Sequence, residues 1–142
     1  MLVDDDPDVL TLTRVFLLRI WPDLEVVTFS NGLEALAYLV GEPANLVLTD
    51  FRMPEMDGLE LTSHLRSMEN QVPVIVMSGN PIEAQALAAG ADAFLAKNDI
   101  PAKLGEALVS LGLLPTQFPD EGRKMMTGYH AARPDAFDSR AE

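Results

Sequence analysis

The chain has 142 residues, which fits one domain, and its 48% hydrophobic content can build a core, which argues against disorder throughout. It contains no cysteine, which excludes disulfides and thiolate metal sites, and its net charge of −12 disfavours direct binding to nucleic acid. A reducing compartment suits this composition, and no apolar run is long enough to span a bilayer, so we expect a cytoplasmic protein without membrane association.

Ten segments alternate between strand and helix along the chain. Apolar runs indicate the strands, and apolar residues spaced three and four apart indicate the helices. Cap signals set several boundaries, such as Asp6 before Pro7 and Asn31 before Gly32. In chain order we predict a strand at 1–3, a helix at 7–20, a strand at 25–29, a helix at 32–41, a strand at 45–49, a helix around 61–68, a strand at 72–77, a helix at 82–89, a strand at 93–96 and a helix at 99–111.

Strands that alternate with helices predict an α/β fold with a parallel sheet covered by helices on both faces. The strands at 45–49 and 72–77 are apolar nearly throughout, as expected for strands with two covered faces. The apolar spacing places Leu12 and Leu33 on the core-facing sides of the first two helices, and Leu104 and Leu108 on that of the last.

The chain changes character after residue 114. Residues 115–142 contain three prolines, scattered charges and little periodicity. We therefore expect one domain at 1–114 and a C-terminal tail at 115–142 that is disordered or loosely docked. A short helix around 121–132 is the alternative.

Polar side chains follow four of the predicted strands, at the point where each strand ends: Asp4 and Asp5, then Asp50, Ser78 and Lys97. In an open parallel sheet these ends meet at one edge, where ligands bind. Gathered carboxylates raise one another's pKa unless a cation joins them, and oxygen ligands without His or Cys favour Mg²⁺ or Mn²⁺. A carboxylate can also accept a phosphoryl group as an acyl phosphate, with a metal and a lysine offsetting the charge.

Taken together, these motifs resemble the receiver domain of response regulators, the phosphoacceptor domain of two-component signalling. The resemblance covers residues 1 to about 114 and implies a flavodoxin-like, doubly wound sheet of five strands in the order 2-1-3-4-5 with five helices. It rests on five stretches: Val3-Asp4-Asp5, LVLTD ending at Asp50, RMPEMDG ending at Gly58, VIVMSG ending at Gly79 and FLAK ending at Lys97.

The resemblance implies that Asp50 is the phosphoacceptor. Asp5 and Asp50 would bind Mg²⁺ directly, with Mn²⁺ as a substitute, and Asp4 would act largely through water. The backbone carbonyl of Arg52 would be a further ligand. Asp57 is instead expected to be only a turn or cap residue.

The resemblance also implies a switch. Lys97 would pair with the phosphoryl group, Ser78 would donate a hydrogen bond to it, and Ser78 with Phe94 would alter a partner-binding face. The phosphoryl donor would be a sensor histidine kinase or a histidine phosphotransfer protein, and the output a downstream protein partner. A phosphorylation-dependent dimer is also allowed. No metabolite turnover is expected beyond self-phosphorylation and self-dephosphorylation.

The alternative function is a binding module that is not phosphorylated, either a pseudo-receiver or a flavodoxin-like ligand binder.

Three local features of the sequence lead to further predictions. Lys97 is followed by Asn98, where the family usually has a proline, so the bond is either trans with a shifted loop or cis at a cost of about 2.5–4 kcal/mol. Gly58 is expected to supply a backbone conformation that other residues resist. Only three residues precede the acid pair, which makes a short central strand.

Overall fold

The computed structural model describes residues 1–114, and the predictions for 115–142 lie outside the described residues. Five parallel strands form one sheet in the order β2-β1-β3-β4-β5, with five α-helices in the described part of the chain, so the predicted fold and strand order are confirmed. The elements are β1 (Leu2–Val3), α1 (Pro7–Ile20), β2 (Thr28–Phe29), α2 (Gly32–Gly41), β3 (Val47–Asp50), α3 (Gly58–Ser67), β4 (Val74–Ser78), α4 (Glu83–Ala88), β5 (Ala93–Ala96) and α5 (Ile100–Ser110).

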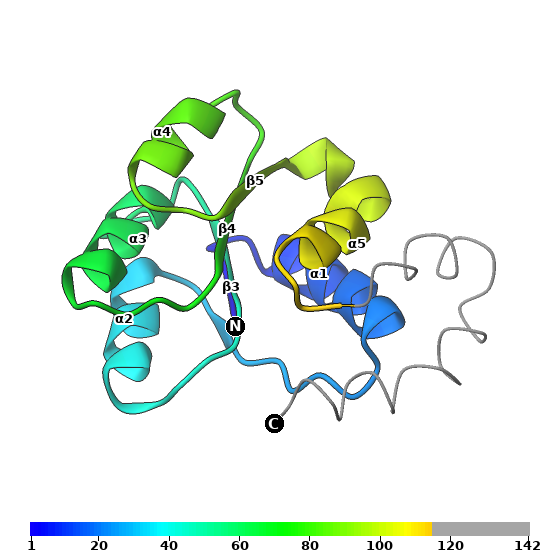
Figure 1. Cartoon of the computed structure of the whole chain (residues 1–142), viewed down its shortest axis with the longest axis horizontal. Helices are drawn as coiled ribbons and strands as arrows, with labels where there is room; N and C mark the ends of the chain where they lie inside the picture. The colour runs from blue at the N-terminus through cyan, green and yellow to red at the C-terminus, as the bar shows by residue number, and fades with distance from the viewer. Residues whose placement is uncertain (115–142) are drawn as a thin grey trace.

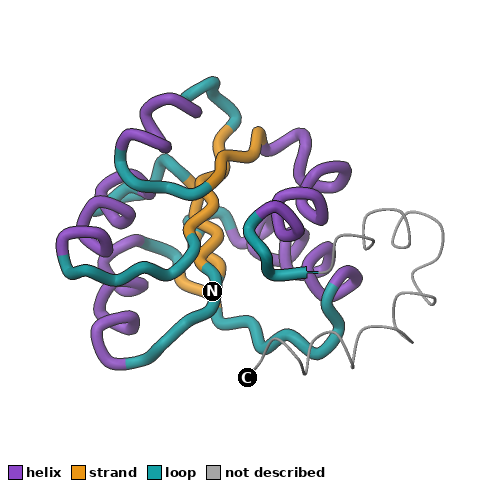
Figure 2. The backbone as a smooth tube through the Cα atoms, viewed as in Figure 1, coloured by secondary structure: helices purple, strands orange, loops and turns teal. Residues whose placement is uncertain are grey.

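The sheet is the middle layer of three (Figure 1). Helices α1 and α5 cover one face, and α2, α3 and α4 cover the other; Figure 2 shows the strands between these two groups. Side chains alternate along each strand, so Leu48 and Ile75 pack toward α1 and α5, while Val47 and Val74 pack toward the other helices. We call these two sides the α1/α5 face and the α2/α3/α4 face. Strands β3 and β4 are buried at every residue, as their apolar sequences predict.

The helix faces were only partly predicted. Leu104 and Leu108 of α5 are fully buried, as expected. Leu12 is 56% exposed and Leu33 is 45% exposed, so their assignment to the core was wrong. Helix α1 carries apolar residues around most of its circumference, and spacing alone could not choose the buried stripe, which includes Leu17.

Strand β2 is shorter than the predicted strand at 25–29, because it pairs only with β1. The ladder joins Leu2 to Thr28 and Val3 to Phe29, and β1 consists of these two residues alone. The short central strand expected from the sequence is therefore present, and it also limits the length of β2.

Two local expectations are resolved by the backbone. Residues 1–114 contain no cis peptide bond, so the bond between Lys97 and Asn98 is trans, and a 3₁₀ turn at Lys97–Asp99 carries the chain from β5 into α5. Asp6 and Asp57 are helix caps: the Asp6 carboxylate accepts from the backbone N–H of Asp8, and Asp57 forms a capping box at the start of α3. None of the helices in this part of the chain is both long and apolar enough to cross a membrane.

Candidate functional site

Three polar residues extend a buried row of leucines past the carboxyl edge of the sheet. Each lies two positions beyond a leucine of the α1/α5 face: Asp4 after Leu2, Asp50 after Leu48, and Lys97 after Leu95. Since side chains alternate along a strand, residues two apart point to the same side. The parallel register brings Asp4 level with Asp50 on the neighbouring strand. Lys97 follows β5, on the far side of β4, and lies two residues beyond the level of Asp50, so its long side chain reaches back to the two acids.

The side chains meet at short distances. The Lys97 ammonium lies 3.0 Å from Asp50 Oδ1 and 3.2 Å from Asp4 Oδ2. Asp4, Asp5 and Asp50 each offer a carboxylate oxygen, and these three atoms lie within 4.8 Å of one another. Asp4 and Asp50 are buried, whereas Asp5 is exposed. The structure thus brings together four of the predicted site residues, with three negative charges against one positive charge.

The environment favours the protonated forms of the two buried acids. Burial raises the pKa of Asp4 to about 6, and the charge of Asp50 adds to the rise, while the hydrogen bond from the Asp6 backbone N–H opposes it. Burial also raises the pKa of Asp50, against the opposing hydrogen bond and charge of Lys97. Burial alone would lower the pKa of Lys97, but the hydrogen bond to Asp50 and the charges of both acids outweigh it and raise that pKa.

We expect the protein in metal-free buffer to gain stability as the pH falls from about 7 to about 5. The Asp4 pKa is about 6 in the folded state against an ordinary value of 3.8, so the folded state binds this proton more readily than the unfolded state. Ionised Asp4 therefore lowers the free energy of unfolding. This loss of stability is absent at pH values below the unfolded-state pKa of Asp4 and complete above its folded-state pKa. The full shift corresponds to about 2–3 kcal/mol, of which roughly half is expected between pH 7 and pH 5, and Asp50 acts in the same direction.

Urea unfolding in the presence of a chelator, across that pH range, measures this effect. Asp4→Asn keeps the shape of the side chain and removes the titration, so its stability should depend on pH much less. Wild-type stability that is flat, or that falls toward pH 5, would contradict the expectation.

The acid cluster has the composition of a site for a hard divalent cation. Its donors are carboxylate oxygens, without nitrogen or sulfur ligands, which favours Mg²⁺ or Mn²⁺ over zinc. The Asp4 Oδ2 atom is buried and accepts no hydrogen bond, although the Lys97 ammonium is near it. A cation among Asp4, Asp5 and Asp50 would offset the excess negative charge and relieve their repulsion. The residues therefore fit the predicted metal.

The loop after Asp50 is held by a close backbone contact at Gly58. A Cβ atom on Gly58 would lie 2.2 Å from the Asp50 carbonyl oxygen, and the Gly58 N–H donates to the Phe51 carbonyl at 2.8 Å. Gly58 does not have a positive φ, so the expected reason for this glycine was wrong: it is needed for close approach. In this loop the left-handed backbone is at Glu55, with φ 72°, and no glycine marks that position in the sequence.

Thr49 also holds the backbone at Asp50, and sequence analysis missed it. Its hydroxyl is fully buried and donates to the Asp50 carbonyl at 3.0 Å. A threonine just before the acid, at the end of an otherwise apolar run, was the available signal.

The remaining predicted residues lie around the cluster. Ser78 ends β4, is buried, and its hydroxyl accepts from the Asn80 N–H at 3.0 Å. It lies two positions beyond Val76, so it continues the row on the α2/α3/α4 face. Phe94 of β5 is half-buried and packs on that same face. The Arg52 guanidinium lies over the ring of Phe51, at 5.1 Å from its centroid. The switch role of Ser78 and Phe94 and the ligand role of the Arg52 carbonyl stay predictions.

With this geometry in place, comparison with known families is decisive. Residues 1–109 match the family model described as the response regulator receiver domain. The chain belongs to this family. Its five-stranded sheet and its acid cluster are those of a receiver domain, a fold module of two-component signalling.

Curated relatives contain similar receiver domains within longer proteins. The chain is 36% identical over 109 residues to the cyclic di-GMP phosphodiesterase response regulator RpfG of Xanthomonas campestris, covering 73% of this chain and 29% of that protein. It is 37% identical over 108 residues to the transcriptional regulatory protein PrrA of Mycobacterium tuberculosis, covering 73% of this chain and 45% of that protein. The chain therefore spans less than half the length of these relatives.

Solved structures agree on the fold. A CheY-like response regulator receiver domain protein from Methanospirillum hungatei is 30% identical, with a TM-score of 0.68, covering 87% of this chain and 94% of that one. The signal receiver domain of the putative response regulator NarL from Mycobacterium tuberculosis is 29% identical, with a TM-score of 0.69, covering 78% of this chain and 91% of that one.

Proposed function

We propose that this receiver domain accepts a phosphoryl group on Asp50 from a phosphohistidine, with Mg²⁺ bound at the acid cluster, and that the resulting aspartyl phosphate alters a partner-binding surface. The observation that carries the proposal is the Lys97 ammonium 3.0 Å from the buried Asp50 carboxylate, beside the oxygens of Asp4 and Asp5. This arrangement supports the proposal, because it combines a carboxylate that could act as a nucleophile, a cationic partner and further carboxylates that could hold a metal ion.

The chemistry needs few groups. One carboxylate oxygen of Asp50 forms a bond to phosphorus as the N–P bond of the phosphohistidine breaks, and the bonding electron pair leaves with the imidazole, which takes up a proton. Lys97 pairs with a phosphoryl oxygen and offsets its charge. A bound Mg²⁺ would supply further positive charge from the side of Asp4, Asp5 and the Arg52 carbonyl. Water later attacks the acyl phosphate and releases inorganic phosphate.

Receiver domains are typically phosphorylated by histidine kinases and linked to output domains. For this chain we propose a sensor histidine kinase or a histidine phosphotransfer protein as the donor, a downstream protein as the receiver of the signal, and the cytoplasm as the compartment. The strong negative charge of the chain supports a protein partner over direct binding to nucleic acid. A phosphorylation-dependent dimer is a further outcome consistent with this role.

Incubation of the full chain with acetyl phosphate and Mg²⁺, followed by intact-mass measurement, tests the proposal. We expect one phosphoryl adduct in the presence of Mg²⁺. No adduct should form when a chelator is present from the start, because formation of the acyl phosphate depends on the metal. Sodium sulfate in place of the phosphodonor controls for ionic effects. The absence of an adduct in the presence of Mg²⁺ would favour the pseudo-receiver or binding-module alternative.

A further inference from the structure

The peptide unit that follows Asp50 is held at both of its polar atoms. Its N–H group, from Phe51, donates to the Met77 carbonyl of β4 at 3.0 Å. Its carbonyl, from Asp50, accepts from the Thr49 hydroxyl at 3.0 Å. The next carbonyl, that of Phe51, accepts from the Gly58 N–H at 2.8 Å. Two successive carbonyls after the buried carboxylate are therefore fixed in direction.

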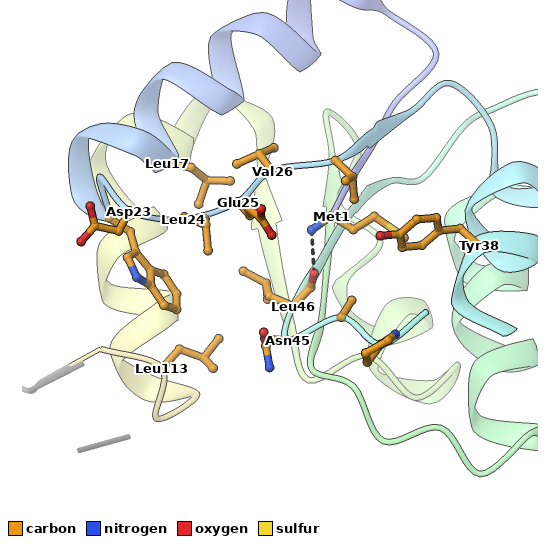
Figure 3. Close-up of a pocket in the computed structure, with 14 residues that line it drawn as sticks. Met1, Leu17, Asp23, Leu24, Glu25, Val26, Tyr38, Asn45, Leu46 and Leu113 are labelled. Atoms are coloured by element: carbon orange, nitrogen blue, oxygen red, sulfur yellow. Dashed lines mark hydrogen bonds between the residues drawn. The ribbon is translucent and has the colours of Figure 1, made fainter. Parts of the chain in front are cut away.

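The Thr49 hydroxyl supplies a bond beyond the end of the ladder between β1 and β3, which reaches only as far as Val3 and Thr49. At the other end of β3, beside a cavity of about 400 Å³, the Met1 ammonium donates to the Leu46 carbonyl at 2.9 Å, and Figure 3 shows this bond as a dashed line. At the acid end, the donor to the Asp50 carbonyl is a side chain of β3 itself. The direction of this peptide unit therefore depends on Thr49.

Packing alone does not explain a hydroxyl at this position. Thr49 is fully buried, and the residues before it in β3, Val47 and Leu48, are apolar. A buried hydroxyl costs free energy unless it is hydrogen-bonded, and a valine would fill the same space without that cost. The Thr49 methyl carbon also lies 3.2 Å from the place of a Cβ on Gly58, so the side chain packs where the loop after Asp50 returns to β3.

We propose that Thr49 is a positioning residue for Asp50: its hydroxyl holds the following peptide unit so that the Asp50 carboxylate and the Arg52 carbonyl can bind one Mg²⁺ ion. This inference rests on the proposed function. Without the hydroxyl, the Asp50 carbonyl loses this donor, and the peptide unit turns toward another one. The turn moves the carboxylate relative to Asp4 and Lys97, which weakens metal binding and slows phosphoryl transfer.

Calorimetric titration of the full chain with Mg²⁺, without a phosphodonor, tests the inference. Thr49→Val keeps the shape of the side chain and removes the hydroxyl, so it should weaken Mg²⁺ binding by about 10-fold or more. Thr49→Ser keeps the hydroxyl and should bind Mg²⁺ nearly as tightly as wild type. Thr49→Ala lacks the methyl group, as serine does, but also lacks the hydroxyl, and should behave like valine. The serine and alanine pair isolates the hydroxyl even where Thr49→Val does not fold.

Thr62→Val is the matched control. Thr62 is also fully buried, and its hydroxyl donates to the Gly58 carbonyl at 2.8 Å. Inside α3 the backbone N–H of Thr62 is a second donor to that carbonyl, so the carbonyl keeps its direction in the variant. The Mg²⁺ affinity of Thr62→Val should therefore equal that of wild type. Equal affinities for wild type, Thr49→Ser and Thr49→Ala would overturn the proposal, and so would equal losses in Thr49→Val and Thr62→Val.

The phosphoryl adduct separates this inference from the proposed function. With acetyl phosphate and saturating Mg²⁺, Thr49→Val should form the adduct about 10-fold more slowly than wild type, and Thr49→Ser should restore the rate. A wild-type chain that binds Mg²⁺ but forms no adduct would overturn the proposed function, and the Mg²⁺ affinities would still decide the role of Thr49. A wild-type chain that binds no Mg²⁺ would overturn both.

Discussion

Asp50→Asn is expected to abolish the phosphoryl adduct and to leave the metal-free protein at least as stable as wild type. Asparagine keeps the shape of the side chain but removes the anionic oxygen that attacks phosphorus in the proposed reaction. It also removes one of the three carboxylates that lie within 4.8 Å of one another, while Lys97 keeps Asp4 at 3.2 Å. Burial raises the pKa of Asp50, so its ionised form lowers the stability of the folded state at neutral pH. Function and stability should therefore change in opposite directions.

Intact mass after incubation with acetyl phosphate and Mg²⁺ measures the first effect, and urea unfolding with a chelator measures the second. Asp57→Asn is the matched control: Asp57 ends the loop that follows Asp50, and asparagine can still cap α3, so the adduct should persist. An adduct that survives in Asp50→Asn would assign the acceptor to another residue. A clear loss of stability without loss of the adduct would make Asp50 a structural group.

Gly58→Ala is expected to destabilise the protein by about 3 kcal/mol and to weaken Mg²⁺ binding. The new Cβ would lie 2.2 Å from the Asp50 carbonyl oxygen and 3.1 Å from its carbon, so the end of β3 or the start of α3 must shift. Either shift moves the Asp50 carboxylate and the loop that follows it. Urea unfolding gives the free energy, and calorimetric titration with Mg²⁺ gives the affinity.

Gly41→Ala is the control for the change from glycine to alanine. Gly41 ends α2, and a Cβ there would meet nothing within 4 Å. We expect a neutral effect or a gain of up to about 1 kcal/mol, because alanine favours the helix. If Gly58→Ala were as mild as Gly41→Ala, the close contact with Asp50 would not constrain the loop.

The sequence predicted the order of the elements and the acid edge because both depend on local patterns. Strand periodicity places Asp4, Asp50 and Lys97 two positions beyond apolar core residues, and parallel pairing brings the carboxyl ends of their strands to one edge of the sheet. Lys97 lies within 3.2 Å of both buried acids even though Asn98 follows it with a trans bond. The charged side chain reaches the site from β5 without the proline that is usual in the family.

What the sequence could not predict depends on contacts between distant segments. The Arg66 guanidinium donates to the carbonyls of Asn70, Val72 and Gly90 and pairs with Asp92 at 2.9 Å, which joins α3 to the segments before β4 and β5. In the sequence it is only one basic residue on a helix. The close approach behind the need for Gly58 is likewise visible only once β3 and α3 are placed together.

The short pairing of β1 has a consequence for motion within the sheet. β1 pairs with β2 and with β3 through two residues each, whereas β3 with β4, and β4 with β5, pair through four. Local opening should therefore be easier on the β1–β2 side, and its amides should exchange with deuterium sooner than those of β3 to β5. Asp4 and Asp5 follow β1, and Asp50 ends β3, so a cation held among them would fasten the more weakly paired half of the sheet to the stronger half. Ion binding at the edge would then also suppress opening of the protein's own central strand.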